Sequence, residues 1–534
     1  MKRKILLAIL STATLLSLTF AISACGSKDA EHEKSDLPAH EHTYATTWST
    51  NDSVHWHAAT CEHEGKRKDP EAHAYDEDYV CTVCKYEHKH TFSNKLVSDF
   101  TTCWYPATCG HDVTRYRVPH GFKNGVCTAC GFVDAGLMYE LNKDGESYAA
   151  YVGRYTKGDV VIPDTYEGKP VTRIKSDGFL NREVTSVVIP DSVTVIEDSA
   201  FYGCAMKSVV IPSSVTSIER EAFSGCDKLE SVVIPDSITR IERLTFFECS
   251  ALERVVIPDS VTVIEDFAFG QCTNLKDISI PDGVTFIGQA AFEGCTSLKK
   301  IVIPSKLTSI EAYAFEGCSS LTNIVIPKGI TSIKKRAFYG CNGLTEIQIP
   351  SGVTLIEPAA FAGCGSVVRI EVAKENARYH SDENCIIETA TNTLIAGCKT
   401  SVIPSYVTVI GASAFEELLT LTSIVIPEGV VTIGEEAFHD CTNLASIVIP
   451  ESLTLIKENA FLFCTALKSI YYKGTAQQWD LIEIKRDFLG RGDIYKATRY
   501  YYSETRPTEE MWASEDNYWH YGANMVPAVW VKDE

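Results

Sequence analysis

Hydrophobic and polar positions recur with a period of about 23 residues between residues 187 and 473. Each unit reads Leu-x-x-Val-x-Ile-Pro-x-x-Val-x-x-Ile and ends in Ala-Phe-x-x-Cys. A fixed period of this length is typical of stacked coils, none of which can bury its apolar face alone. We therefore predict a solenoid of about 11 coils over residues 187–475, interrupted by an insert at residues 370–400. The repeated prolines are Pro212, Pro235, Pro258, Pro281, Pro304, Pro327, Pro350, Pro404, Pro427 and Pro450.

Each coil is predicted to contain a short strand and a helical turn, which makes the fold a mixed α/β repeat. In one representative coil, Val232 and Ile234 alternate with outward positions, the pattern of a strand. Pro235 ends this strand because proline has no N–H to donate to a ladder. Phe246 and Cys249 lie three residues apart, a spacing that places both on one face of a helical turn.

Phenylalanine and cysteine occupy fixed positions in the repeat, and both are predicted to be buried. An aromatic side chain at one position of every coil indicates a stack of rings in the core. The cysteines invite a disulfide or metal interpretation, but one coil carries Leu418 at the cysteine position. Leucine can replace a packed thiol but neither a metal ligand nor a disulfide, so we expect buried, free thiols. The cysteines are Cys204, Cys226, Cys249, Cys272, Cys295, Cys318, Cys341, Cys364, Cys441 and Cys464.

The residue two before each proline is predicted to point away from the core, because side chains alternate across a strand. In most coils it is valine, which predicts an exposed apolar ribbon with a charged rim, suited to binding a partner. The alternative is that β-branched residues simply suit a strand and pack on one another. The candidate partner-binding residues are Val188, Val210, Val233, Val256, Val302, Val325, Val425 and Val448.

These units resemble the BspA-like class of bacterial leucine-rich repeats. The resemblance rests on phrases such as LESVVIPDSITRIERLTFFEC and LTSIVIPEGVVTIGEEAFHDC, and it covers roughly residues 137–475. It implies that the insert at 370–400 is a hairpin-like island. Residues 135–186 are expected to form an N-terminal β cap and the first coil. The resemblance also implies a surface-exposed protein whose role is adhesion or protein binding.

The N-terminus predicts a lipid anchor. Three basic residues precede an apolar stretch from Ile5 to Ile22, the features of a secretory signal peptide. Cys25 follows small residues, as in a lipobox, so we expect residues 1–24 to be removed and Cys25 to carry lipid. Residues 25–39 would then be a lipidated tether on the extracellular face of the cell membrane. The alternative is an ordinary signal peptide with a coincidental cysteine.

Residues 40–87 and 88–134 form two copies of a His/Cys-rich module, offset by 48 residues. Each copy ends in Cys-x-x-Cys, and His55 of the first copy corresponds to Cys103 of the second. Because histidine and cysteine are both tetrahedral zinc ligands, we predict one structural zinc in each zinc-ribbon-like module. The predicted metal ligands are His55, Cys61, Cys81, Cys84, Cys103, Cys109, Cys127 and Cys130.

Two other interpretations of the modules remain open at this stage. Disulfides are an alternative, because an extracellular compartment is oxidising. A zinc-scavenging role would require open, exchangeable sites. Catalytic zinc is disfavoured, because no His-Glu-x-x-His motif accompanies the ligands.

The net charge and the absence of certain motifs reduce the number of functions to be considered. A net charge of −21 argues against binding to nucleic acid or to anionic lipid. No nucleophile motif, paired carboxylates or phosphate loop stands out, so we predict that the protein is not an enzyme. The leading hypothesis is a lipid-anchored surface protein that binds an extracellular protein or glycan through its exposed sheet. The alternative is a zinc-handling lipoprotein with the solenoid as scaffold.

The C-terminal segment, residues 476–534, departs from the repeat and is rich in tyrosine and tryptophan. We expect it to cap the open end of the solenoid, which stacked repeats need for solubility. The alternative is an aromatic platform for carbohydrate.

Overall fold

The computed structural model describes residues 136–486, 493–513 and 517–532, together with strands β1 to β8 and Ala129 in the preceding part of the chain. The chain divides into two units, residues 1–95 with 105–115, and residues 96–104 with 116–534. In the first unit, β1, β2 and β3 form an antiparallel sheet. The early strands are β1 (Tyr44–Thr50), β2 (Val54–Ala59), β3 (Arg67–Ala72), β4 (Val97–Ser98), β5 (Thr102–Pro106), β6 (Thr114–Pro119), β7 (Phe122–Lys123) and β8 (Val126–Cys127).

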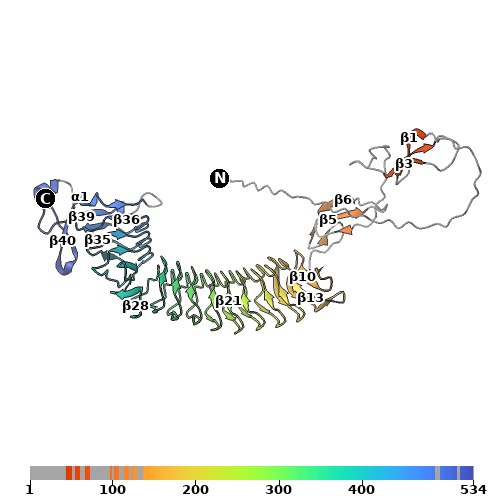
Figure 1. Ribbon diagram of the computed structural model, residues 1–534, viewed down its shortest axis with the longest axis horizontal. Coiled ribbons are helices and arrows are strands. Elements are labelled where there is room, and N and C mark those ends of the chain that lie inside the picture. The colour runs from red at the N-terminus through yellow and green to blue at the C-terminus, as the bar shows by residue number, and fades with distance from the viewer. Residues whose placement is uncertain are drawn as a thin grey trace, which may run out of the picture. The chain divides into compact units, whose positions relative to one another are not determined.

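The second unit contains the solenoid, whose coils stack side by side (Figure 1). The strands before each proline form its first face, here called the valine face. They pair in parallel with the next coil, so that Val232 of β18 lies beside Val255 of β20. The strands are β11 (Lys157–Val161), β14 (Glu183–Val188), β16 (Ser208–Val210), β18 (Ser231–Val233), β20 (Arg254–Val256), β22 (Asp277–Ser279), β26 (Glu346–Ile349), β28 (Arg369–Val372), β33 (Ser423–Val425), β35 (Ser446–Ile449), β37 (Ser469–Tyr472), β39 (Thr498–Tyr502), β40 (Asn517–Tyr521) and β41 (Pro527–Val529).

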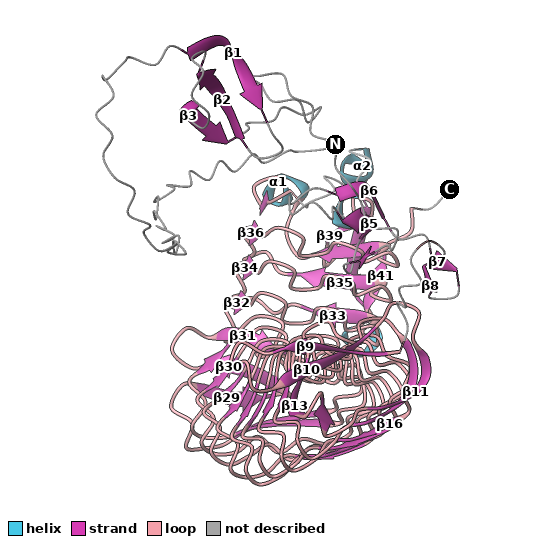
Figure 2. Ribbon diagram, turned by 90° about the vertical axis from the view of Figure 1, so that its right-hand side faces the viewer, coloured by secondary structure: helices cyan, strands magenta, loops and turns pink. Residues whose placement is uncertain are grey.

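A second face is built from two-residue strands after each proline, whose isoleucines point into the core. Figure 2 shows how both sets of strands surround the same interior. The strands of this face and its N-terminal cap are β9 (Leu137–Leu141), β10 (Tyr148–Val152), β12 (Thr165–Tyr166), β13 (Lys169–Ile174), β15 (Val195–Ile196), β17 (Ser217–Ile218), β19 (Arg240–Ile241), β21 (Val263–Ile264), β23 (Phe286–Ile287), β24 (Ser309–Ile310), β25 (Ser332–Ile333), β27 (Leu355–Ile356), β32 (Val409–Ile410), β34 (Thr432–Ile433), β36 (Leu455–Ile456) and β38 (Glu483–Ile484).

The predicted helical turn at Ala-Phe-x-x-Cys is wrong. In the coil of Phe246, both Leu244 and Glu248 have φ near +59°, which interrupts a right-handed helix. The N–H groups of Leu244, Phe246 and Glu248 donate to carbonyls of the next coil over 3.0, 2.9 and 2.9 Å. The segment is therefore a turn bonded to its neighbour. Helix is confined to the C-terminal cap in the described residues: α1 (Ala476–Trp479), α2 (Glu509–Ala513), η1 (Asp493–Tyr495) and η2 (Ala523–Met525).

The solenoid has about 14 turns, more than the 11 predicted. One further coil contains Phe179, within residues 135–186 where a first coil is expected, although neither the alanine nor the cysteine of the repeat accompanies this phenylalanine. Its ring lies 4.8 Å from Phe201, centroid to centroid. From Phe201 to Phe361 the rings stack at 5.3 to 5.7 Å with small interplanar angles. The prediction of a buried aromatic stack is confirmed.

The island at 370–400 joins two stacks with separate hydrophobic cores. Three antiparallel strands build it: β29 (Tyr379–Asp382), β30 (Cys385–Glu388) and β31 (Thr393–Ala396). The last of these pairs in parallel with β32 and restarts the coils. One core extends from Ala150 to Cys398 and the other from Cys385 to Tyr518.

At each end of the solenoid, one of the two sheets ends in a strand of reversed direction. At the N-terminal end β9 pairs antiparallel with β10, whereas β10 pairs in parallel with β13. At the C-terminal end β39 and β40 extend the valine-face sheet in parallel, and β41 then pairs antiparallel with β40. The aromatic tail therefore covers the end of the solenoid.

Candidate functional site

The valine face exposes a row of apolar side chains along the solenoid. Seven of the eight candidate valines are between 48 and 81 % exposed, namely Val188, Val210, Val233, Val256, Val302, Val325 and Val425. Their neighbours on each strand, such as Val232 and Ile234, are buried. Alternation along the strand therefore produces the ribbon that the sequence predicts. We call this row the valine ribbon.

Val448 is an exception, and its predicted exposure is wrong. It is only 3 % exposed, and its neighbour on the next strand is Tyr471 instead of another valine. The ring of Tyr471 packs 5.3 Å from Tyr500 and 5.5 Å from Trp519, which is fully buried. The aromatic cap thus covers this end of the valine face, and the valine ribbon stops before it.

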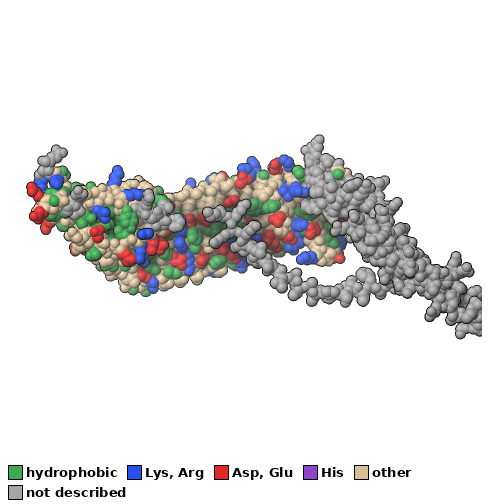
Figure 3. Space-filling view, turned by 90° about the horizontal axis from the view of Figure 1, so that it is seen from above, with side chains coloured by type: hydrophobic (Ala, Val, Ile, Leu, Met, Phe, Trp, Pro, Cys, Tyr) green, Lys and Arg blue, Asp and Glu red, His purple; other side chains and the backbone are tan. Residues whose placement is uncertain are grey.

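Charged side chains border the valine ribbon at the residues that precede each strand. Lys207 lies 3.8 Å from Glu230, and Lys276 lies 2.8 Å from Glu253 of the adjacent coil. These pairs are largely exposed, so each contributes little to stability. Figure 3 shows side chains of both charges and hydrophobic side chains interspersed on one face of the solenoid.

The hydrogen-bonded ladder of the valine face is interrupted in two central coils. Strand pairing runs from β11 to β22 and resumes between β26 and β28. Residues 300–303 and 323–326 form no strand, and an isolated bridge between Asp277 and Lys300 is the remaining ladder contact of the described residues there. Val302 and Val325 belong to these two coils.

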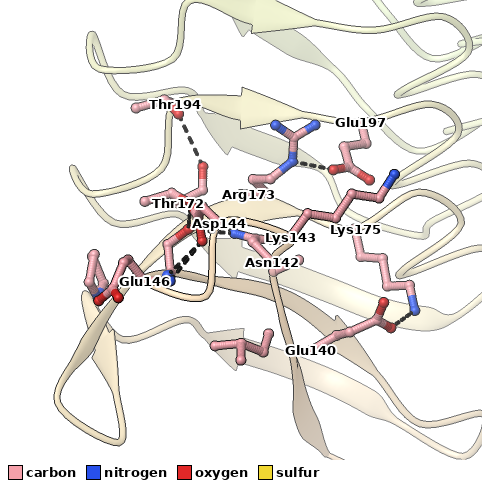
Figure 4. Close-up of a pocket in the computed structure, with 14 residues that line it drawn as sticks. Glu140, Asn142, Lys143, Asp144, Glu146, Thr172, Arg173, Lys175, Thr194 and Glu197 are labelled. Atoms are coloured by element: carbon pink, nitrogen blue, oxygen red, sulfur yellow. Dashed lines mark hydrogen bonds and ion pairs between the residues drawn. The ribbon is translucent and has the colours of Figure 1, made fainter. Parts of the chain in front are cut away.

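A polar cleft lies at the N-terminal end of the solenoid, between the β9–β10 loop and strands β13 and β15 (Figure 4). Its charges are paired with one another: Arg173 with Glu197, and Lys175 with Glu140. Hydrogen bonds from the Glu146 N–H and the Ser147 hydroxyl lower the pKa of Asp144. Asn142 donates to Ser147 over 2.8 Å and to Thr172 over 3.2 Å. These contacts hold the loop in place, and no side chain in the cleft is arranged as a nucleophile beside a base.

A second polar cluster, which the sequence analysis missed, lies where the two stacks meet. Arg336 contacts Glu316 through two nitrogens, at 3.1 and 3.2 Å, and its guanidinium lies 3.5 Å from the centre of the Tyr339 ring. Burial and the Glu417 carboxylate raise the pKa of Tyr339. The sequence does contain an indication of this cluster: Glu417 stands where several coils have the glycine that precedes the repeat cysteine.

Glu416 and His439 extend this cluster into the second stack. Glu416 is buried, and its Oε2 has no hydrogen-bond partner among the described atoms. His439 Nδ1 lies 3.7 Å from Glu416 Oε1 and 3.5 Å from Asp440 Oδ2. The Glu416 carboxylate, with Asp440 and Glu436, raises the pKa of His439 against the opposing effect of burial.

The ten repeat cysteines are buried and free, as predicted. Each thiol donates to the carbonyl of a phenylalanine one coil earlier, as Cys249 does to Phe223 over 3.1 Å. Burial raises the pKa of these thiols, to about 12 for Cys318 and Cys364. They are therefore packing groups and poor nucleophiles.

Six of the predicted lipid and metal residues lie outside the described part of the chain: Cys25, Cys61, Cys81, Cys84, Cys109 and Cys130. His55, Cys103 and Cys127 belong to strands β2, β5 and β8, whose side chains are not described. Within the described residues no group of three or more potential ligands is placed to hold a metal ion. The described helices also include none with the length and apolar character needed to cross a membrane.

Comparison with known proteins identifies one family. A sequence model of the BspA type leucine rich repeat region matches residues 172–299, 262–388 and 395–481. No curated protein matches the chain.

Several solved structures are similar. A leucine-rich cell surface protein from Faecalibacterium prausnitzii has 27 % identity over 66 % of this chain and 97 % of its own, with a TM-score of 0.40. A leucine-rich repeat protein from Bacteroides ovatus has 25 % identity over 67 % of this chain and 99 % of its own, with a TM-score of 0.37. The pneumococcal vaccine antigen PcpA has 16 % identity over 78 % of this chain and 95 % of its own, with a TM-score of 0.31.

Proposed function

Because this chain belongs to the BspA-type leucine-rich repeat family, we propose that it is a non-catalytic cell-surface protein that binds an extracellular protein or glycan through its valine ribbon. The observation that carries the proposal is the exposure of seven valines in register along one face. An exposed apolar strip with a polar rim is a typical protein-binding surface, and here polar Ser279 and Gln348 interrupt the strip in two coils. The surface location rests on the family and on the predicted signal peptide.

The valine ribbon is tested with residues 26–534, produced without the signal peptide and the predicted lipid site. Replacing Val233, Val256 and Val302 by lysine places charge where apolar contact is expected. Binding to immobilised extracellular proteins and glycans should weaken by at least about tenfold. A matched variant with lysine at Val431, Val526 and Val531, which are exposed away from the valine ribbon, should bind like the wild type. Equal binding by all three proteins would refute the proposal.

We infer that Cys25 anchors the protein by lipid, so that the solenoid is displayed outside the cell. Metabolic labelling with a fatty-acid analogue should modify the wild type but not a Cys25→Ser variant. Labelling that persists in the variant would contradict this assignment.

The His/Cys modules are proposed to bind structural zinc. Support comes from the exchange of His55 for Cys103 between the two copies, because few roles other than metal binding accept it. Elemental analysis of reduced protein should find about two zinc ions per chain. Cys84→Ser and Cys130→Ser should each lower this content, whereas Cys249→Ser in the solenoid core should not. Absence of zinc from the reduced wild type would remove the proposal and favour disulfides.

A further inference from the structure

We infer that the central part of the valine ribbon, residues 296–306 and 319–328, binds an extended acidic segment of a partner protein that also carries apolar side chains. We call these two stretches, one from each of two adjacent coils, the basic segment. The inference rests on the proposed function, since it names the chemistry of a partner for the same surface.

The basic segment has an unusual charge for this protein. It contains Lys299, Lys300, Lys306 and Lys328 and no aspartate or glutamate, in a chain whose net charge is −21. All four lysines are exposed. In the described part of the chain none of them has a carboxylate within ion-pair distance, unlike Lys207 and Lys276 of earlier coils. Four cations without an ion-pair partner therefore face solvent in two adjacent coils.

The neighbouring carboxylates compensate this charge only in part, because Asp282 interacts electrostatically with Lys306 but forms no ion pair with it. In the preceding coil, Asp282 accepts hydrogen bonds from the Ser305 N–H and hydroxyl, at 2.8 and 3.2 Å. Asp277 lies beside Lys300 in the strand register without forming an ion pair. In the following coil, Glu346 accepts a hydrogen bond from Gln348. An anionic partner therefore meets four exposed cations whose charge the neighbouring carboxylates balance only in part.

Apolar surface lies between the lysines. Val302 and Val325 are 75 % and 73 % exposed, more than the valines of most other coils. Along the chain Val302 lies between Lys300 and Lys306, and Val325 lies between Lys306 and Lys328. Because the ladder is interrupted in these coils, the two valines are able to adjust to a ligand without breaking strand pairing.

This combination favours a peptide over a glycan. Burying valine is favourable only against apolar surface, which a peptide supplies through its side chains. Acidic saccharides offer carboxylates but little apolar surface, and the basic segment contains no aromatic ring on which a sugar would stack. An extended peptide presents side chains alternately, so that carboxylates and apolar groups reach the lysines and the valines together.

The test uses residues 26–534 and a labelled synthetic peptide in which glutamate and valine alternate. Fluorescence anisotropy should show binding at least about tenfold tighter than that of a peptide alternating lysine and valine. Replacing the four lysines of the basic segment by glutamate should abolish this preference. The matched control carries glutamate at Lys374, Lys399, Lys457 and Lys468, which are also exposed. This control has the same net charge as the basic-segment variant, but it should bind the peptides like the wild type.

Three outcomes would overturn the inference. Equal loss in both charge variants would show a response to net charge alone. Equal or tighter binding of a polyuronate would assign the surface to acidic glycans. Self-association of the wild type, seen by light scattering and lost in the basic-segment variant, would assign it to a second copy of this chain.

Failure of this inference is distinguishable from failure of the proposed function. If Val233, Val256 and Val302 are needed for binding to immobilised extracellular molecules but the four lysines are not, the valine ribbon remains the binding surface and only the acidic-peptide assignment falls. If neither set matters, both fall.

Discussion

The repeat cysteine acts as a packing group with one specific hydrogen bond. Its Sγ donates to a phenylalanine carbonyl in the adjacent coil, at 3.0 to 3.2 Å in each of the ten coils. Leu418 fills the same position without a donor and is buried. The hydrogen bond is therefore dispensable in one coil, whereas an apolar side chain of suitable volume is present in all of them.

We predict that these thiols resist alkylation in the folded protein. Burial removes access and raises the pKa of Cys318 to about 12, so little thiolate forms at neutral pH. Site-resolved mass spectrometry after iodoacetamide treatment should find the ten repeat cysteines unmodified in buffer and fully modified in denaturant. Rapid modification of most of them without denaturant would contradict the buried stack.

At the scale of elements, the junction between the two stacks depends on polar side chains. The island separates the apolar cores, and Arg336 with Tyr339 in one stack faces Glu416 and Glu417 in the other. A buried carboxylate is costly unless it is paired. Within the second stack, a protonated His439 lies at ion-pair distance from Glu416, so its protonation stabilises the buried carboxylate at this junction.

We predict that His439 makes the junction less stable as pH rises. The pKa of His439 is raised in the folded state, chiefly by Glu416, relative to about 6.5 in the unfolded chain. Its stabilising contribution is fully present below about pH 6.5 and is lost as pH increases through the folded-state value. Denaturation of the wild type should therefore become easier across this window.

The control is the His439→Gln variant. It should lose the contribution of His439 to the pH dependence of stability and keep the contributions of the other histidines. The informative quantity is the difference in unfolding free energy between the two proteins at each pH. A constant difference from acidic to mildly alkaline pH would refute the role of His439.

At the scale of the whole molecule, contacts between neighbouring coils dominate, so stability is approximately a sum over coils and their interfaces. The stack of rings runs without interruption from Phe179 to Phe361 and again from Phe415 to Phe461. No ring contact joins Phe361 to Phe415 in the described part of the chain. The island is thus the weakest point of the core.

We predict that the solenoid unfolds in two steps that separate at the island. Hydrogen exchange in increasing denaturant should reveal two cooperative groups of amides, one before residue 370 and one after residue 400. Replacing Glu416 by alanine, which removes part of the polar junction, should widen the gap between the two transitions. A single transition for all amides, with equal calorimetric and van't Hoff enthalpies, would contradict this model.

Much of the solenoid follows from the sequence because one period repeats many times. The inward positions of Val232, Ile234 and Phe246 were predictable from alternation and spacing alone. The turn was not, because a spacing of three residues suits both a helix and the observed turn. Many coils have glycine directly before the cysteine, and at Gly225 this residue has a positive φ. Such a glycine indicates a left-handed backbone conformation, which a helix would not contain.

The functional surface was less predictable where the repeat ends. Val448 has the sequence context of an exposed valine but is buried, because Tyr471 replaces the valine of the next coil and packs against Trp519 from outside the repeat. The junction cluster likewise depends on Arg336 and Glu416, which are distant in sequence and meet across the island. Contacts between residues so far apart in sequence cannot be predicted from the pattern of a single coil.

The antiparallel strands β9 and β41 have a consequence for how the molecule behaves at high concentration. Parallel coils present at each end an edge that another copy could extend, and a growing filament would result. At each end the reversed strand closes one of the two sheets, β9 that of the second face and β41 that of the valine face, so a copy stacked there would find a matching parallel edge in only one sheet. We therefore expect discrete particles of fixed length, so that the number of coils encoded in the gene alone sets the reach of the surface that each molecule displays.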